Sequence, residues 1–231
     1  MQMTAAVPSR QTTHEWVRDR MRDAILAGEF TPGSRIVQTE IAEKYGVSVT
    51  PVREAMRELL GEGLIRVDPH KAATVREFVL DEALEISELR LMLEPLAVRR
   101  AAPVITDEEI ARLESIQEQL DQHPDDLAWV ELNHRWHIVV LEATRSPWLT
   151  EILGRLRGIS RFYLAASMRA STVDRDKSNA DHHAMIEAFH RRDAEAAGQI
   201  MDSHIIATAD LAARFAGMKG ASDVAGEPAA S

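Results

Sequence analysis

The sequence contains no cysteine among its 231 residues. Disulfide scaffolds, thiolate zinc fingers, iron–sulfur clusters and cysteine nucleophiles are therefore excluded. No apolar run approaches the ~18–20 residues of a membrane span, and the N-terminal MQMTAAVPSR lacks the apolar stretch of a secretory signal. These absences predict a soluble cytoplasmic protein without membrane contact.

An excess of positive charge is also missing, since the formal net charge is -10. An acidic surface repels phosphates, so this total argues against a nucleic-acid partner. The charge is unevenly divided, however: residues 1–76 carry 11 Lys and Arg against 10 Asp and Glu, whereas residues 77–231 carry 16 against 27. The excess of acidic residues lies in the second part of the chain. The net charge therefore does not argue against binding of a nucleic acid by the first part.

The sequence pattern changes near Arg76, from short segments broken by Gly and Pro to long helical periods. We predict a mostly α-helical protein with two domains. The predicted boundaries are a disordered tail at 1–10, a winged helix-turn-helix domain at 11–76, a linker at 77–80, an all-helical domain at 81–216 and a disordered tail at 217–231.

The first domain has the order helix, turn, helix, followed by a small hairpin. Thr12 and Glu15 have the spacing of a capping box, and Gly46 separates the second helix from the third. LIRV and ATV read as short strands joined by DPHK. The predicted helices span 12–27, 39–45 and 49–61, which together with the hairpin is the arrangement of a winged helix-turn-helix.

The third predicted helix presents groups that suit DNA near its N-terminal end. Hydroxyls and free N–H groups there bind phosphate, and an arginine one turn later reaches a guanine edge in the major groove. These candidates are Ser48, Thr50, Arg53 and Arg57, with Arg35, His70 and Lys71 as flanking backbone contacts. The alternatives are an ordinary solvated helix face and a winged helix that contacts protein.

The second domain shows about six helical segments and no strand signal. Thr106 and Glu109 form a second capping box, and prolines stand in the joints. The predicted segments are 81–101, 107–121, 125–144, 148–171, 174–191 and 193–216. They predict an all-α bundle.

Three of these helices place a histidine at an inward position. Asn133 and His137 lie four residues apart on one apolar stripe, and His182 and His204 each interrupt another. A single inward histidine is more often a hydrogen-bonded core residue than a ligand. Three of them together favour a divalent metal, because one ion satisfies all the buried imidazoles.

Arg90 stands on the predicted inward stripe of the first bundle helix, with Ile86, Leu89, Leu93 and Ala97. A buried guanidinium needs an anion. That anion is either Glu94, one turn later, or the carboxylate of a bound ligand. Arg161 is a second effector-binding candidate, for which a solvated face is the ordinary interpretation.

The first domain resembles the GntR family of bacterial transcription regulators, through ILAGEFTPGSRI, TEIAEKYGVSVTPVREAMRELLGEGLIRV and DPHKAATV. The resemblance implies operator binding to double-stranded DNA as a homodimer, with Thr50 and Arg53 on the recognition helix, Arg35 before the second helix, and His70 and Lys71 on the wing. The family usually has glycine where this chain has Ala72.

The second domain resembles the FCD domain of the FadR branch of that family. The matching motifs are Glu88, Arg90 and Glu94, then NHRWH at 133–137, then His182 and His204. The resemblance implies a divalent metal such as zinc or nickel and a small carboxylate effector anchored by Arg90. The family's metal ligands are an aspartate and three histidines, so Asn133 replaces the carboxylate and removes a negative charge.

These observations predict a metabolite-responsive transcription regulator, most often a repressor in this family. Two alternatives follow from the residues alone. The three-histidine site could belong to a metal-dependent enzyme, although no convincing general base or nucleophile accompanies it. The chain could also be a DNA-binding protein with a purely structural metal.

Overall fold

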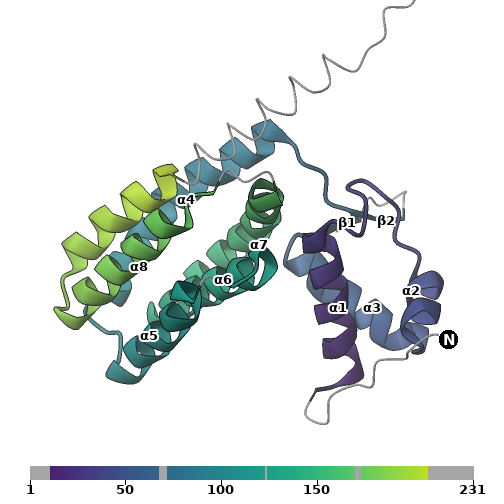
Figure 1. The fold of residues 1–231 in the computed structure, drawn as a ribbon, viewed down its shortest axis with the longest axis horizontal. Coiled ribbons are helices and arrows are strands. Elements are labelled where there is room, and N and C mark those ends of the chain that lie inside the picture. Colours follow the sequence, from purple (N-terminus) through teal and green to yellow (C-terminus); the bar gives the residue numbers. More distant parts are fainter. Residues whose placement is uncertain (1–10, 68–71, 123, 170–172, 208–231) are drawn as a thin grey trace, which may run out of the picture. The chain divides into compact units, whose positions relative to one another are not determined.

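The computed structural model describes residues 11–67, 72–122, 124–169 and 173–207. The chain divides into two compact units, Met1–Phe78 and Val79–Ser231 (Figure 1). Both predicted tails, 1–10 and 217–231, lie outside the described residues, as do His70 and Lys71 of the predicted wing tip.

The first unit contains three helices and a two-stranded hairpin. The elements are α1 (Thr13–Ala27), α2 (Gln38–Tyr45), α3 (Val49–Gly61), β1 (Ile65–Val67) and β2 (Ala73–Val75). The capping box of α1 is confirmed, because the Glu15 carboxylate accepts from Thr12 N at 2.8 Å and Thr12 Oγ1 accepts from Glu15 N. Gly46 ends α2 in the left-handed region, with φ 66°, where a side chain would be strained.

The hairpin pairs β1 with β2 in antiparallel register, with Ile65 opposite Val75. The chain before α2 adds to it, since Ile36 N donates to Ala73 O at 2.8 Å and Val75 N donates to Ser34 O at 2.9 Å. The bend that allows this addition needs Gly33, whose φ is 80°. This third segment was not predicted, and it holds Arg35 against the hairpin, bridged to Thr74.

The core of the first unit lies between α1 and α3, where Val17, Met21, Val52 and Leu59 are fully buried. Ion pairs run along the same seam and join residues of the two helices. They are Arg18 with Glu58 at 2.6 Å and Arg22 with Glu62 at 2.5 Å. The seam holds α3 rigidly by one face and leaves the opposite face open.

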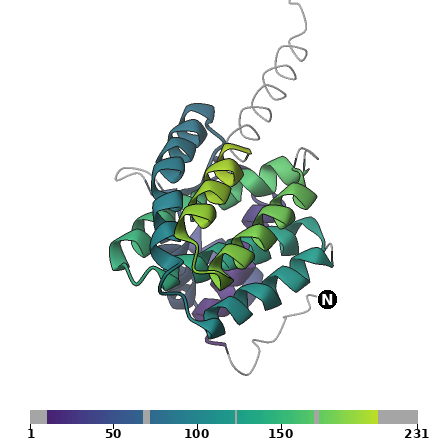
Figure 2. The same cartoon turned by 90° about the vertical axis from the view of Figure 1, so that its left-hand side faces the viewer.

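The second unit is all-helical in its described part, as predicted. Its helices are α4 (Leu80–Ala101), α5 (Asp107–Asp121), α6 (Asp126–Ala143), α7 (Pro147–Arg169), α8 (Arg175–His190) and a last one at 194–207 (Figure 2). α6 packs between α5 and α7, α4 packs on α6 and α7, and α5 packs on α8. The second capping box, Thr106 with Glu109, is confirmed at the start of α5. No helix of the described chain is both long and apolar enough to cross a membrane.

One predicted inward residue of α4 is wrong. Leu89 is 38% exposed, whereas Ile86, Arg90 and Ala97 of the same predicted stripe are buried. Leu89 lies to one side of that stripe, in a row with the exposed Met92 and Leu96. The helix therefore has two apolar rows, and only one of them faces the bundle.

Candidate functional site

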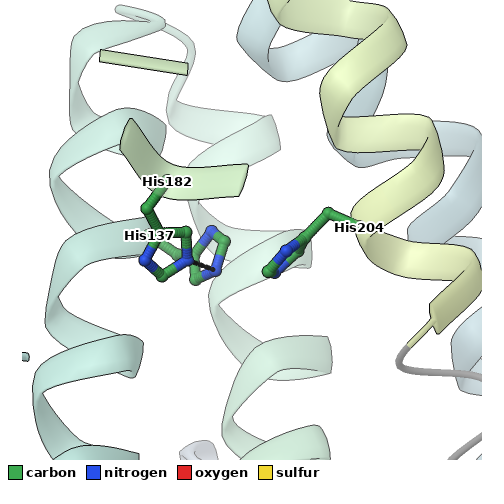
Figure 3. Close-up of side chains that lie close together, drawn as sticks. All are labelled: His137, His182 and His204. Carbon is green, nitrogen blue, oxygen red and sulfur yellow. Dashed lines mark hydrogen bonds between the residues drawn. The ribbon is translucent and has the colours of Figure 1, made fainter. Parts of the chain in front are cut away.

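Three histidines from three helices meet inside the bundle (Figure 3). His137 comes from α6, His182 from α8 and His204 from the helix at 194–207, and their side chains point toward one another. They are 1%, 0% and 5% exposed. One ring nitrogen of each lies within 4.8 Å of the others, and the Nε2 atoms of His137 and His182 are 3.3 Å apart. Two nitrogens on a tetrahedral zinc are separated by roughly 3.3 Å, so the spacing suits a metal.

The outer ring nitrogens of two of these histidines face oxygen acceptors. His182 Nδ1 donates to Gln117 Oε1 at 3.0 Å, and His204 Nδ1 donates to Asp181 Oδ2 at 3.3 Å. These bonds place the ring proton on Nδ1 and leave the Nε2 lone pair directed into the cluster. Such outer partners are typical of metal-ligating histidines.

Asn133 adds an oxygen one turn before His137 on α6. Its side chain is buried, and its Oδ1 has no hydrogen-bond partner among the described residues. A buried carbonyl oxygen left unpaired costs about 1–3 kcal/mol, which a bound cation would remove. Asn133, His137 and His204 line the same cavity. The donor set of three imidazole nitrogens and one amide oxygen therefore fits a divalent metal.

The protonation of the cluster also suits a metal. Burial lowers the pKa of His137 and of His182 well below 6.5, and the Arg157 charge lowers both further. Burial lowers the pKa of His204 as well, against the opposing effect of Asp181. All three rings are neutral at pH 7, which is the form that binds metal.

Beside the histidines lies a buried group of three charged side chains. Arg90 Nε donates to Glu94 Oε1 at 2.5 Å, and Arg157 of α7 donates to the other oxygen of Glu94. Burial would raise the pKa of Glu94, but Arg157 and Arg90 hold it below its usual value. Burial lowers the pKa of Arg157 to about 9, so its guanidinium is charged at pH 7. Of the two alternatives for Arg90, the structure shows Glu94 as its partner, and the group of two arginines and one glutamate has one excess positive charge.

Arg161 is also buried, so its predicted solvated position is wrong. Its Nη1 donates to Glu131 Oε2 at 2.8 Å, and the side chain is 4% exposed. The residue occupies α7 one turn after Arg157, on the same inward face.

These side chains surround one cavity of about 320 Å³. Its wall includes Arg90, Asn133, His137, Arg157, Arg161 and His204. The volume is that of a site for a small organic molecule. Positive side chains on the wall outnumber negative ones, since Lys177 joins the three arginines against Asp174 and Asp181, and this excess suits an anion.

Two residues of the site were not predicted. Arg157 contacts Glu94 and His137, which are 63 and 20 positions away in the sequence, and the local sequence pattern does not indicate either contact. Gln117 interrupts the apolar row of Ile110, Leu113 and Leu120 on α5, and that interruption was a usable signal.

The predicted DNA contacts lie on the open side of the first unit. Ser48, Thr50, Arg53 and Arg57 are all exposed on or just before α3, and Ser48 begins the helix without a side-chain capping bond. Arg35 is exposed beside the hairpin. The structure thus presents these five side chains to solvent.

Comparison with known proteins assigns both units. Residues 13–75 match the gntR family of bacterial regulatory proteins, and residues 85–207 match the FCD domain. The transcriptional regulator McbR of Escherichia coli is 27% identical over 78% of this chain and 83% of its own length. The galactonate operon transcriptional repressor of the same organism is 24% identical over 76% and 86%.

A solved structure of E. coli McbR/YncC shows the same fold, with a TM-score of 0.73 over 88% of this chain and 98% of that chain at 23% identity. These relatives are transcriptional regulators and not enzymes, which removes the metal-dependent enzyme as an interpretation of the three histidines. This chain belongs to the GntR family of transcription regulators, in the branch that carries a C-terminal FCD domain.

Proposed function

We propose that the protein is a homodimeric repressor that binds operator DNA in the bacterial cytoplasm and releases it when a small organic acid enters the bundle cavity. The observation that carries this proposal is one cavity of about 320 Å³ that is lined by two histidines of the cluster, His137 and His204, and by three buried arginines. An acidic bundle has no evident use for such a cationic cavity unless an anion binds there.

On the DNA side, Arg53 and Arg57 would reach base edges from the first turns of α3. Ser48 and Thr50 would bind phosphate, with Arg35, His70 and Lys71 on the flanking backbone. Because the first unit is nearly neutral overall, nonspecific attraction to DNA is weak and recognition depends on these few groups.

On the effector side, His137, His182 and His204 with Asn133 would hold zinc or nickel, and Arg90 with Arg161 would orient a carboxylate. A bound metal would offer an open coordination position to a carboxylate oxygen. Effector binding must favour an arrangement of the two DNA-binding units of the dimer that does not bind the operator. A tenfold change in operator affinity requires about 1.4 kcal/mol of coupling.

An exposed apolar face of the bundle supports the dimer. Met92 and Leu96 of α4 are 65% and 51% exposed, and Trp148 and Ile152 of the neighbouring α7 are 72% and 46% exposed. A face of this kind on a monomer marks an interaction site, and a two-fold operator requires two copies of α3. We place the second copy of the chain on this α4/α7 face.

A screen of small organic acids by thermal shift, with and without added zinc or nickel, tests the effector site. An acid that raises the melting temperature should also release operator DNA. The shift should be largely lost in Arg90→Ala and kept in Arg100→Ala, which removes an exposed arginine of the same helix. Equal shifts in the two variants would remove Arg90 from the effector site.

Light scattering tests the dimer. Met92→Glu places a charge on the α4/α7 face and should give a monomer, whereas Val104→Glu, at an exposed apolar residue after α4, should stay dimeric. A dimeric Met92→Glu variant would contradict the assignment of this face.

A further inference from the structure

The metal donors of this chain bring no negative charge. They are three neutral imidazoles and the amide oxygen of Asn133. Beside them lie Arg90, Arg157 and Glu94, which together carry one excess positive charge. Asp181 contacts the outer nitrogen of His204, but Lys177 compensates its charge at 2.6 Å. A dication placed beside this surplus is repelled, and at low dielectric that repulsion is large.

Arg157 also contacts a proposed metal ligand directly. Its Nη2 lies 2.6 Å from His137 Nδ1. A guanidinium only donates hydrogen bonds, so Nδ1 accepts and the ring proton of His137 is on Nε2. That proton points to His182 Nε2 at 3.3 Å, and His182 in turn donates from Nδ1 to Gln117.

The result is a continuous chain of donors and acceptors from Arg157 through His137 and His182 to Gln117. Both ring nitrogens of His137 and of His182 have partners without a metal. In His137 the proton is on the inner nitrogen, Nε2. In His182 and His204 it is on the outer nitrogen, Nδ1.

His137 must change this arrangement to become a ligand through Nε2. In the neutral ring the proton then lies on Nδ1, where the Arg157 N–H already points. Two donors do not remain 2.6 Å apart, so Arg157 has to turn away from His137. It keeps its bond to Glu94, and the freed N–H faces the cavity that both arginines line.

We propose that Arg157 couples metal and organic anion: it opposes metal binding while the cavity is empty, and it binds the carboxylate once His137 has released it. The anion supplies the negative charge that the donor set lacks, so the two ligands bind cooperatively and each weakly alone. This inference rests on the metal site of the proposed function.

The test measures Ni²⁺ affinity by equilibrium dialysis in sodium acetate and in sodium chloride of equal ionic strength. For the wild-type protein we expect at least roughly tenfold tighter binding in acetate, which corresponds to about 1.4 kcal/mol. Arg157→Met should bind Ni²⁺ more tightly than wild type in chloride and should lose most of the acetate effect.

Arg155→Met is the matched control, because Arg155 is an exposed arginine of the same helix, and it should behave as wild type. An acetate effect that persists undiminished in Arg157→Met would overturn the coupling while leaving the metal site in place. If wild type binds no Ni²⁺ in either salt, both the coupling and the three-histidine metal site are refuted.

Long-range ¹H–¹⁵N NMR of the metal-free wild-type protein provides a readout that needs no variant. We expect the Nε2–H tautomer for His137 and the Nδ1–H tautomer for His182 and His204. An Nδ1–H tautomer of His137 in this state would show that Arg157 does not hold it, and would overturn the proposal even if Arg157→Met fails to fold.

Discussion

The two units of this protein bury very different side chains. Among the described residues, the first unit buries one charged side chain, that of Arg76, whereas the second buries four charged groups, three histidines and several amides and hydroxyls. The first unit keeps its ion pairs along the α1/α3 seam, where they remain partly exposed. A buried polar group costs free energy unless it is paired. Buried polar groups are concentrated in the second unit, where a small ligand would bind in a cavity. They are scarce in the first unit, which would bind DNA through exposed side chains.

This comparison implies that removing one buried charge should destabilise the bundle alone. Glu94→Ala leaves Arg90 and Arg157 without their carboxylate, and breaking a buried pair in this way costs about 3–5 kcal/mol. Calorimetry should show a lower unfolding temperature for the second unit and an unchanged unfolding temperature for the first. Glu88→Ala, at an exposed position of the same helix, should leave both transitions unchanged. A similar loss in both variants would mean that burial is not the cause.

The next largest effect concerns the metal. A His137→Ala/His182→Ala double variant removes two of the three imidazole nitrogens and should lower metal affinity by more than about 100-fold, or about 2.7 kcal/mol. Elemental analysis after dialysis in sodium acetate should find metal in wild type and almost none in the double variant. His183→Ala/His190→Ala removes two exposed histidines and is the control. Equal metal content in all three proteins would refute the site.

On the first unit, one exposed arginine should matter for function and not for stability. Arg53→Ala should weaken binding to an operator selected from random duplexes by about 1–3 kcal/mol, because a bidentate contact to guanine is worth that much. Its melting temperature should not change, since the side chain is exposed. Arg20→Ala, on the exposed face of α1, should bind the operator normally. Unchanged affinity of Arg53→Ala would remove α3 as the recognition helix.

Acid should also separate the stabilities of the two units. Burial lowers the pKa of all three bundle histidines in the folded protein, so below about pH 6.5 the unfolded chain takes up protons that the folded bundle does not. The metal-free bundle therefore has its full stability above that pH. Below that pH, its free energy of unfolding should fall by up to about 1.4 kcal/mol per pH unit for each of the three histidines.

Calorimetry in the presence of a chelator checks this pH dependence. The first unit contains no buried histidine among its described residues, so its transition should change little between pH 7 and 5.5. A parallel decline of both transitions would contradict the assignment of the effect to the buried histidines.

Much of the fold was predictable because its signals are local. The capping boxes at Thr12 and Thr106 mark helix starts through contacts three residues apart, and both are present. Leu89 shows the limit of periodicity: α4 has two apolar rows, and the sequence pattern does not say which one faces the bundle. The third segment of the wing was missed because backbone pairing between residues near 35 and 74 leaves no mark in the side-chain pattern.

The residue pattern by itself determined the mostly helical fold, the exposed arginines of α3 and the inward positions of His137, His182 and His204, since one helix period is enough to place a side chain on a face. Only the tertiary structure decided which inward groups meet. Glu94 lies between Arg90 and Arg157, and the outer nitrogen of His137 faces a donor, because of the way α4, α6 and α7 pack. Such contacts depend on the rotation of each helix about its axis and on helix spacing, which no local sequence period specifies.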